Sequence, residues 1–173
     1  MATRILIDGY NLIAHLWPSL SFTQDDLQEA REKLLNKLVH YQSYKKHQIT
    51  VVFDAWQGGM PTSRRENYRG IAIVYTKLGE TADHFIRKIL EQDDRGLVVV
   101  TSDRQIADWA KVRKVPVVSS ADFAKKMEMA AIMEIRGGEE ENYGENTLST
   151  KKKGNPKKLP RSQRQSQSFR KKL

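Results

Sequence analysis

The sequence contains no cysteine, which excludes disulfide bonds, thiolate zinc sites and thiol nucleophiles. Long apolar runs are also absent at the N-terminus, where only three apolar residues separate Arg4 from Asp8. Such a start fits neither a signal peptide nor a membrane-spanning helix, so we expect a cytoplasmic protein that does not enter a membrane. The four histidines lack the spacing of a metal site, and neither a P-loop nor a glycine-rich dinucleotide motif occurs.

Positive charge dominates the chain and is concentrated at its C-terminal end. The net charge is +9, and from Gly137 to Leu173 ten lysines and arginines outnumber four glutamates, a net charge of +6. The apolar pattern ends at the same point, so we predict a folded domain over residues 1–136 and a basic, disordered tail over residues 137–173. The charge favours a polyanionic partner such as RNA, and a merely solubilising tail is the alternative.

Short apolar runs alternate with amphipathic stretches along the predicted domain. The runs predict strands at about 3–8, 49–54, 71–76, 97–102 and 115–118. The amphipathic stretches predict helices at about 25–46, 80–91, 104–113 and 121–135. This alternation predicts an α/β fold in which a central, mostly parallel, five-stranded sheet is covered by helices on both faces. Residues 55–70 show neither pattern and are predicted to form a long loop.

Three aspartates directly follow predicted strands, namely Asp8, Asp54 and Asp103. The carboxyl ends of parallel strands share one edge of a sheet, and ligands of open α/β sheets bind in the crevice at that edge. Carboxylates crowded there repel one another unless a cation lies between them, and oxygen ligands without cysteine select Mg²⁺ or Mn²⁺. Each aspartate taken alone also fits a turn or a helix N-cap, which is the structural alternative.

A fourth aspartate, Asp83, lies in the first turn of a predicted helix. It shares a helical face with Ile86 and Leu90, so it is predicted to head the buried stripe of that helix. A buried charge needs a partner, which is either a metal ion or Arg87 one turn later. Asn11, which follows the first predicted strand, is a further candidate and would either orient a water or a phosphate or cap a loop.

The predicted loop over residues 55–70 carries the residue types that bind RNA. Arginines contact phosphates and aromatic rings stack on bases, whereas no helix-turn-helix or zinc motif indicates binding in a duplex groove. We therefore predict single-stranded RNA as the ligand, and an ordinary solvated loop with a packed tryptophan is the alternative. The candidate RNA-binding residues are Arg64, Arg65, Arg69, Tyr68 and Trp56.

Four motifs carry a resemblance to a known family, and they are Ile5–Ile13, Val51–Asp54, Gly79–Asp83 and Val99–Asp103. In these motifs the chain, from Met1 to about Arg136, resembles the NYN domain, a branch of the PIN-like metal-dependent ribonucleases. It is most similar to the bacterial YacP-like group, which includes a ribosome-associated mRNA endonuclease. The resemblance implies a three-layer α/β/α fold, a Mg²⁺ or Mn²⁺ site, and cleavage of RNA.

The resemblance also assigns roles to individual residues. It gives the acidic role to Asp8, Asp83 and Asp103, and accessory positions to Asn11 and Asp54. The sequence thus predicts a metal-dependent endoribonuclease that cleaves mRNA in association with the ribosome, with a metal-activated water attacking the phosphate. A non-catalytic RNA- or ribosome-binding protein that retains the fold is the alternative, because the basic tail would serve either function.

Overall fold

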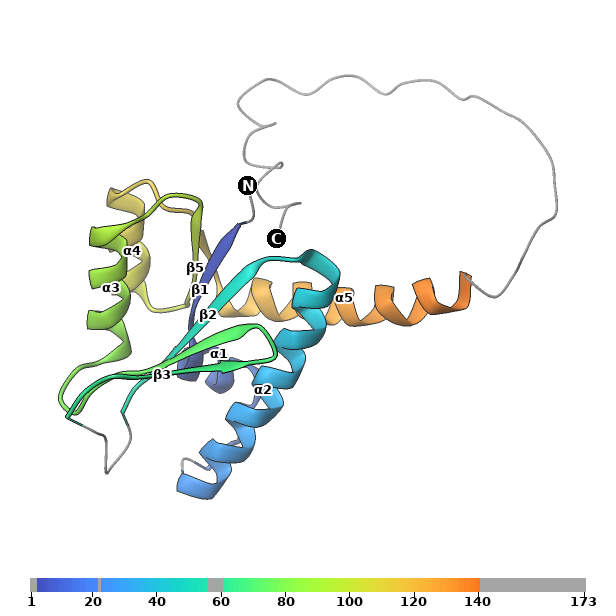
Figure 1. Ribbon diagram of the computed structural model, residues 1–173, viewed down its shortest axis with the longest axis horizontal. Helices are drawn as coiled ribbons and strands as arrows, with labels where there is room; N and C mark the ends of the chain where they lie inside the picture. The colour runs from blue at the N-terminus through green and yellow to red at the C-terminus, as the bar shows by residue number, and fades with distance from the viewer. Residues whose placement is uncertain (1–2, 22, 56–60, 141–173) are drawn as a thin grey trace, which may run out of the picture.

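The computed structural model describes residues 3–21, 23–55 and 61–140 of the chain. Within these residues, six strands form one sheet in the order β3-β4-β2-β1-β5-β6 (Figure 1). Neighbouring strands are parallel except β3 and β4, which form an antiparallel hairpin. The strands are β1 (Arg4–Asp8), β2 (Gln48–Phe53), β3 (Arg64–Tyr68), β4 (Ile71–Tyr75), β5 (Leu97–Val100) and β6 (Val117–Val118). The predicted mostly parallel α/β sheet is confirmed, with six strands instead of five.

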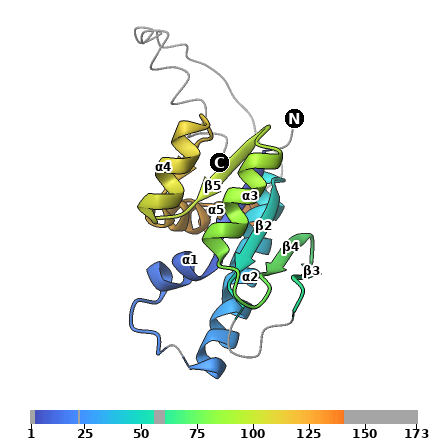
Figure 2. The same cartoon turned by 90° about the vertical axis from the view of Figure 1, so that its left-hand side faces the viewer.

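Helices cover both faces of this sheet and give the fold three layers (Figures 1 and 2). In the described part of the chain they are α1 (Gly9–Leu16), α2 (Gln24–Lys45), α3 (Ala82–Gln92), α4 (Arg104–Val112) and α5 (Ser120–Glu140). α1, α2 and α5 pack on one face, and α3 and α4 lie side by side on the other. None of the helices described is both long and apolar enough to cross a membrane.

The apolar runs of the central strands follow from this layering. Side chains of a strand alternate between the two faces, so Ile5 and Ile7 join the core under α1, α2 and α5, whereas Leu6 joins the core under α3 and α4. All of β5 is buried for the same reason. A strand covered on both faces needs apolar residues at every position, which is why the sequence shows continuous runs instead of alternation.

The order of the strands places a switch point in the middle of the sheet. From β1 the chain moves through β2 to β4 in one direction, and α3 then carries it back to β5 on the other side of β1. The helix that follows β1 and the helix that follows β5 therefore leave toward opposite faces. Ligand crevices of open α/β sheets form at such a point, outside the carboxyl ends of the two strands.

The structure corrects the prediction of a long loop over residues 55–70. Arg64–Tyr68 form β3, the edge strand of the hairpin, and the turn to β4 uses positive φ angles at Arg69 (49°) and Gly70 (91°). An edge strand has one paired side only and tolerates charged side chains, so β3 lacks the apolar run that identified the other strands.

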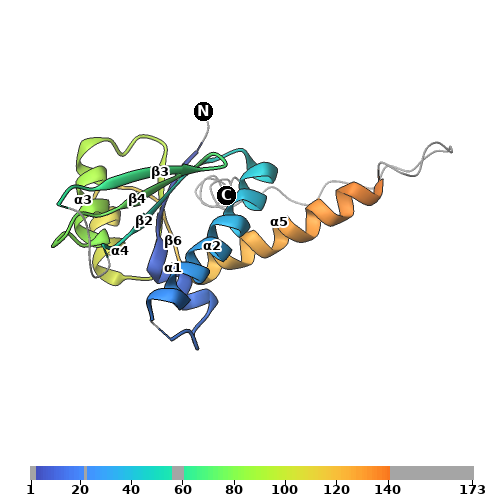
Figure 3. The same cartoon turned by 60° about the horizontal axis from the view of Figure 1, so that its bottom comes forward.

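Two helix boundaries also differ from the prediction. α1 was not predicted, because it has only eight residues and starts directly after β1. α5 continues through Gly137 to Glu140, past the position at which the predicted tail begins, and Figure 3 shows its C-terminal part extending beyond the sheet. The predicted N-terminal start of α2 is close to the observed one, with Thr23 as its N-cap.

Gly9 is the position at which α1 approaches β2 most tightly. A Cβ atom placed on Gly9 would collide with the Phe53 ring and would lie 2.9 Å from the carbonyl oxygen of Val52. We predict that Gly9→Ala lowers the free energy of unfolding by about 1–3 kcal/mol, because the ring must move to make room. Urea unfolding followed by circular dichroism measures this change.

The control variant is Ala14→Ser, on the exposed side of the same helix. It should change the free energy of unfolding by no more than about 0.5 kcal/mol. Equal stability of Gly9→Ala and the wild type would contradict the close approach of α1 to β2.

Candidate active site

Asp8 ends β1 at the switch point and is the N-cap of α1. One carboxylate oxygen accepts a hydrogen bond from the backbone N–H of Asn11 (3.4 Å), and the other accepts one from the Thr101 hydroxyl (3.5 Å). Burial raises the pKa of Asp8 to about 6; the Asn11 N–H opposes this rise, and the charges of Asp54 and Asp103 add to it. Asp54 and Asp103 therefore each lie near enough to Asp8 to disfavour its ionisation.

Asp54 directly follows β2, and its side chain links the end of this strand to α3 by a hydrogen bond. Its carboxylate accepts a short hydrogen bond from the backbone N–H of Ala82, the first residue of α3, while the Thr81 side chain caps the same helix. A carboxylate at a helix N-terminus is stabilised by the unpaired N–H groups there. Asp54 thus fixes the start of the helix that carries Asp83.

Asp103 is the N-cap of α4, as one of the sequence-based alternatives stated. Its carboxylate accepts a hydrogen bond from the Gln105 N–H (2.7 Å), and its own N–H donates to the Thr101 hydroxyl (3.1 Å). Since Thr101 donates in turn to Asp8, one threonine joins the two aspartates. Asp103 is exposed to solvent, in contrast to Asp8.

Asp83 lies on the core side of α3, as its helical phase predicted, but it is half-buried at the margin of the buried stripe and not within it. The buried residues of α3 are Ala82, Phe85, Ile86 and Leu90. The Asp83 side chain keeps 32% of its surface exposed and forms an ion pair with Arg87 (3.0 Å). Arg87 also donates to the Gln105 side chain (3.3 Å), which ties α3 to α4 beside the crevice.

Asn11 holds three segments together at the carboxyl end of the sheet. Its side-chain oxygen accepts hydrogen bonds from the Ser102 N–H (2.9 Å) and from the buried Ser120 hydroxyl (2.6 Å). The Ser120 N–H donates to the Ser102 hydroxyl (3.1 Å), which closes the network. Asn11 therefore positions α1, the β5–α4 connection and the start of α5, a role that the sequence alone did not reveal.

Sequence reasoning missed Thr101, Ser102 and Ser120 as members of the site. The signal was present, because Thr101 and Ser102 separate β5 from Asp103, and Ser120 is the first residue of α5. Hydroxyl residues at such positions commonly bond to nearby backbone groups. Their partners on α1 are far away in sequence and become evident only from the fold.

The carboxylates have the chemistry of a Mg²⁺ or Mn²⁺ site but are not drawn tightly around one point. Among residues 3–21, 23–55 and 61–140, no three Asp, Glu or His side chains lie close enough to hold a metal ion together. Mg²⁺ commonly keeps several waters and binds through one or two carboxylates and substrate phosphates, so a tight cluster is not required. Burial raises the pKa of Asp8 and the charges of Asp54 and Asp103 add to the rise, so a cation bound there would stabilise the ionised carboxylate.

The predicted RNA-binding residues lie on the hairpin and not beside the carboxylates. Arg64 forms an ion pair with Glu66 (2.5 Å), and the Arg69 guanidinium lies 5.6 Å from the centre of the Tyr68 ring. Residues of one strand alternate between faces, so Arg65 points away from the face that carries Arg64 and Tyr68. Trp56 lies outside the described residues.

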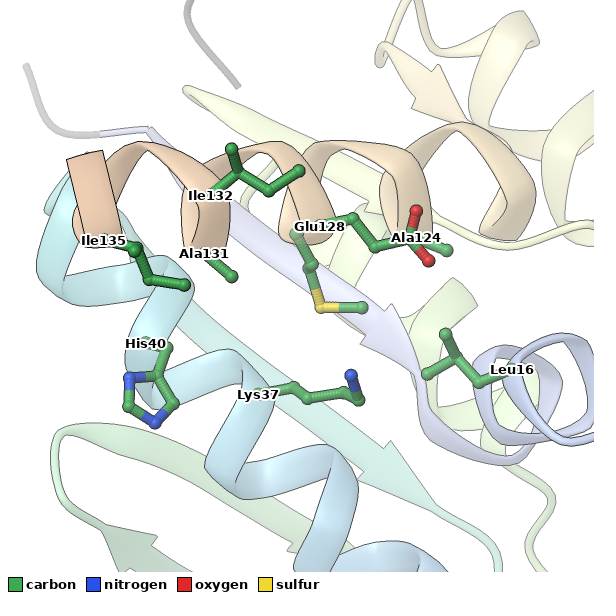
Figure 4. A pocket seen from close by; sticks show the side chains of 9 residues that line it. Leu16, Lys37, His40, Ala124, Glu128, Ala131, Ile132 and Ile135 are labelled. Carbon is green, nitrogen blue, oxygen red and sulfur yellow. The ribbon is translucent and has the colours of Figure 1, made fainter.

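Two hollows lie on the face of the sheet that α2 covers. One, of about 510 Å³, lies between α2 and α5 and is lined mainly by apolar α5 residues together with Lys37 and His40 (Figure 4). The other, of about 380 Å³, lies between α2 and the β3–β4 hairpin. No carboxylate of the crevice lines either of them.

A doubly wound α/β protein with acidic side chains at its switch point is the class that this geometry defines. The family model for the YacP-like NYN domain matches residues 5–171, and the chain belongs to that family. The match extends well beyond the domain boundary predicted near residue 136. Membership is consistent with a nuclease or RNA-related function, as the motifs implied.

Similar proteins come from Bacillus subtilis. The chain is 38% identical over 88 residues to "Uncharacterized protein YacP" of strain 168, and the match spans about half the length of that relative and half of this chain. The crystal structure of Rae1 (YacP) matches with 30% identity and a TM-score of 0.63 over 81% of each chain. A tryptophan-to-leucine mutant of Rae1 matches with 27% identity and a TM-score of 0.65, over 80% of this chain and 82% of the other.

The raised pKa of Asp8 leads to a test in metal-free protein. Ionisation of Asp8 disfavours the folded state, so this group's contribution to stability decreases as the pH rises from about 4 to about 6. Asp8→Asn keeps a hydrogen-bond acceptor and removes the charge. We predict that it raises the free energy of unfolding near pH 7.5 by about 1–3 kcal/mol, with little difference from the wild type near pH 4.

Urea unfolding in the presence of chelator at both pH values measures the effect. Asp108→Asn is the control, because Asp108 is exposed and pairs only with Lys111 on the same helix. The same difference in the free energy of unfolding between Asp8→Asn and the wild type at both pH values would show that ionisation of Asp8 does not destabilise the folded state.

Proposed function

We propose that the protein is a metal-dependent endoribonuclease that cleaves mRNA in association with the ribosome. The observation that carries this proposal is the half-buried Asp8 carboxylate at the switch point, whose pKa is raised to about 6 by burial first and then by the charges of Asp54 and Asp103. Binding of a phosphate alone would not need a half-buried carboxylate, because like charges repel. Membership in the YacP-like NYN family supports the same reading.

Asp8, Asp54, Asp83 and Asp103 would hold Mg²⁺ or Mn²⁺ with their oxygen atoms, which these ions prefer. Since no three of them lie close enough to bind one ion together, waters and substrate phosphates would complete its ligands. When bound, the metal supplies activation of a water and neutralisation of charge on the phosphate. Asp8 would be the central ligand because it ends β1, the strand between β2 and β5, and is less exposed to solvent than Asp103 at the end of β5.

Protein residues around the carboxylates would position them and the substrate. Thr101 orients Asp8 through its hydroxyl, and Asn11 fixes the backbone from which Ser102 and Asp103 project. Arg87, held by Asp83 and Gln105, would meet a phosphate oxygen. The basic C-terminal segment would add affinity for RNA that does not depend on sequence.

A second function, non-catalytic binding of RNA or the ribosome, is favoured by one specific observation. Asp54 and Asp103 cap helices and Asp83 pairs with Arg87, so each of these aspartates has a structural partner. Carboxylates kept only for such purposes would not bind a metal. The two functions therefore differ in what Mg²⁺ or Mn²⁺ does to the protein.

Metal binding can be tested without an activity assay. We predict that Mn²⁺ at about a hundredfold excess over its dissociation constant raises the melting temperature of the wild type by about 5–10 °C, because it binds only the folded state. Asp8→Asn should abolish the shift and Asp108→Asn should retain it, as measured by calorimetry. An equal shift for Asp8→Asn would place the metal elsewhere, and no shift for the wild type would favour non-catalytic binding.

Cleavage is tested on mRNA with and without ribosomes, in Mg²⁺, Mn²⁺ or chelator. We predict that Asp8→Asn, Asp83→Asn and Asp103→Asn each slow cleavage by about a hundredfold or more, because each removes charge stabilisation at the phosphate. Asp108→Asn should cleave like the wild type. Cleavage that survives chelation, or that is the same with Asp83→Asn as with the wild type, would overturn the metal mechanism as stated.

A further inference from the structure

The hollow between α2 and the β3–β4 hairpin, here called the hairpin pocket, has the dimensions of a ligand site. Its volume of about 380 Å³ lies within the range of about 300–1,000 Å³ that is typical of pockets for small ligands. The β3–β4 hairpin, which the sequence did not predict, forms one wall of this pocket, and α2 forms the other. The pocket is also separate from the carboxylates described above.

The strand register shows which hairpin residues form the pocket. Residues directly opposite each other in an antiparallel pair point to the same face, so Glu66 lies with Ile73, and Tyr68 with Ile71. This face also carries Arg64 and Tyr75, and it is turned toward α2. Buried Ile73 and Leu35 line the pocket, and the half-buried rings of Tyr68 and Tyr75 stand around them.

Arg31 of α2 lines the same pocket and has unused hydrogen-bonding capacity. One of its N–H groups donates to the Tyr10 hydroxyl (3.0 Å), and its guanidinium lies 5.8 Å from the centre of the Tyr75 ring. Within the described part of the chain its remaining N–H groups have no acceptor, and the Tyr75 hydroxyl has no hydrogen-bond partner. The pocket thus presents a planar cation and an aromatic hydroxyl to whatever enters it.

The lining chemistry matches a flat, uncharged ligand with donors and acceptors at its edge. Tyrosine rings and a guanidinium offer planar surfaces, and Asn36 and Glu66 offer an amide and a carboxylate. Arg31 is balanced by Glu32, and Glu66 is paired with Arg64, so the pocket lacks the excess of positive charge that would select a phosphate. Bases of single-stranded RNA stack on such planes and form hydrogen bonds through their exposed edges.

A chain of aromatic contacts connects the pocket to the carboxylates. The Tyr10 ring packs edge-on against Phe53 (5.2 Å between centres), and Phe53 stacks on Tyr75 (5.7 Å). Asp54 directly follows Phe53 in sequence. Because neighbouring strands are about 4.8 Å apart, β4 lies about 10 Å from β1 along the same edge of the sheet.

We propose that the hairpin pocket binds one unstacked base of a single-stranded RNA whose backbone runs along the carboxyl edge of the sheet to the carboxylates. The substrate class rests on the proposed function, whereas the pocket and its ligand chemistry are properties of α2 and the hairpin. Arg31 contacts the base with its guanidinium plane and its free N–H groups, and Tyr68 and Tyr75 contact the base with their rings. Arg64, at the start of β3, meets the adjoining phosphate.

The first test compares Arg31→Lys with Arg113→Lys in the full chain. Both variants keep the positive charge and lose a planar guanidinium that lies over an aromatic ring, but Arg113 is the C-cap of α4, on the other face of the sheet. Binding of a short, fluorescent single-stranded RNA is measured by anisotropy in chelator, so that cleavage does not interfere, at several salt concentrations. We predict about fivefold or greater weakening for Arg31→Lys with an unchanged salt slope, and less than about twofold for Arg113→Lys.

Equal affinities of Arg31→Lys and Arg113→Lys would overturn the proposal. A change of the salt slope without loss of affinity at low salt would also overturn it, because that result would indicate a phosphate contact. Tyr68→Leu and Tyr68→Phe form a second matched pair if Arg31→Lys proves unstable. Tyr68→Phe loses the hydrogen bond to Asn36 but keeps the ring, so it should bind RNA more tightly than Tyr68→Leu. Equal binding by these two variants would likewise contradict stacking.

A second test separates the pocket from the proposed function. Guanosine and adenosine monophosphates are titrated into the wild type, with ribose 5-phosphate as the probe that lacks a base, and followed by NMR. We expect the nucleotides to change the chemical shifts of the Asn36 side-chain amide and of the β3 residues, and we expect no such change with ribose 5-phosphate. Absent or equal shifts would overturn the pocket even if cleavage is observed, whereas base-dependent shifts without any cleavage would contradict only the endoribonuclease.

Discussion

Three helix N-termini converge on the carboxyl end of the sheet, and the rest of the site depends on how they compensate its negative charge. Asp8 caps α1, Asp103 caps α4, and Asp54 accepts from the first N–H of α3. Unpaired N–H groups and the helix dipoles lower the free energy of these carboxylates without removing their mutual repulsion. The same aspartates therefore fix three helices and leave the crevice short of positive charge, which is the condition under which a cation binds.

How far the sequence predicts this structure depends on the environment of each element. Strands covered on both faces, such as β2 and β5, are evident as apolar runs. β3 was missed because an edge strand can consist of charged residues, and α1 because it is a short helix beginning at a glycine. Helical phase placed Asp83 on the correct side of α3 but could not show that Arg87 would hold it at the margin of the core. The Asn11 network joins residues that are 91 and 109 positions apart, which no local pattern encodes.

The hairpin changes the arrangement of the residues proposed to bind RNA. As a loop, Arg64, Arg65, Tyr68 and Arg69 would form one mobile basic surface. As a strand, they are divided between two faces, and only one of these faces meets α2. Tyr68 is fixed further by its hydroxyl, which donates to Asn36 (2.8 Å). Ordering by the hairpin reduces the conformational entropy that a ligand would otherwise have to overcome on binding.

Both margins of the sheet have features that discourage the addition of a further strand. At one margin β3 consists of charged and polar residues apart from Tyr68, and at the other β6 has only two residues. Long, flat, apolar margins are the templates on which chains aggregate, and neither margin of this sheet is of that kind. Other macromolecules must therefore recognise this domain through side chains and surface shape and not by extending its backbone hydrogen-bond ladder. The protein can in this way remain separate from other copies of itself at the concentrations that folding and synthesis produce.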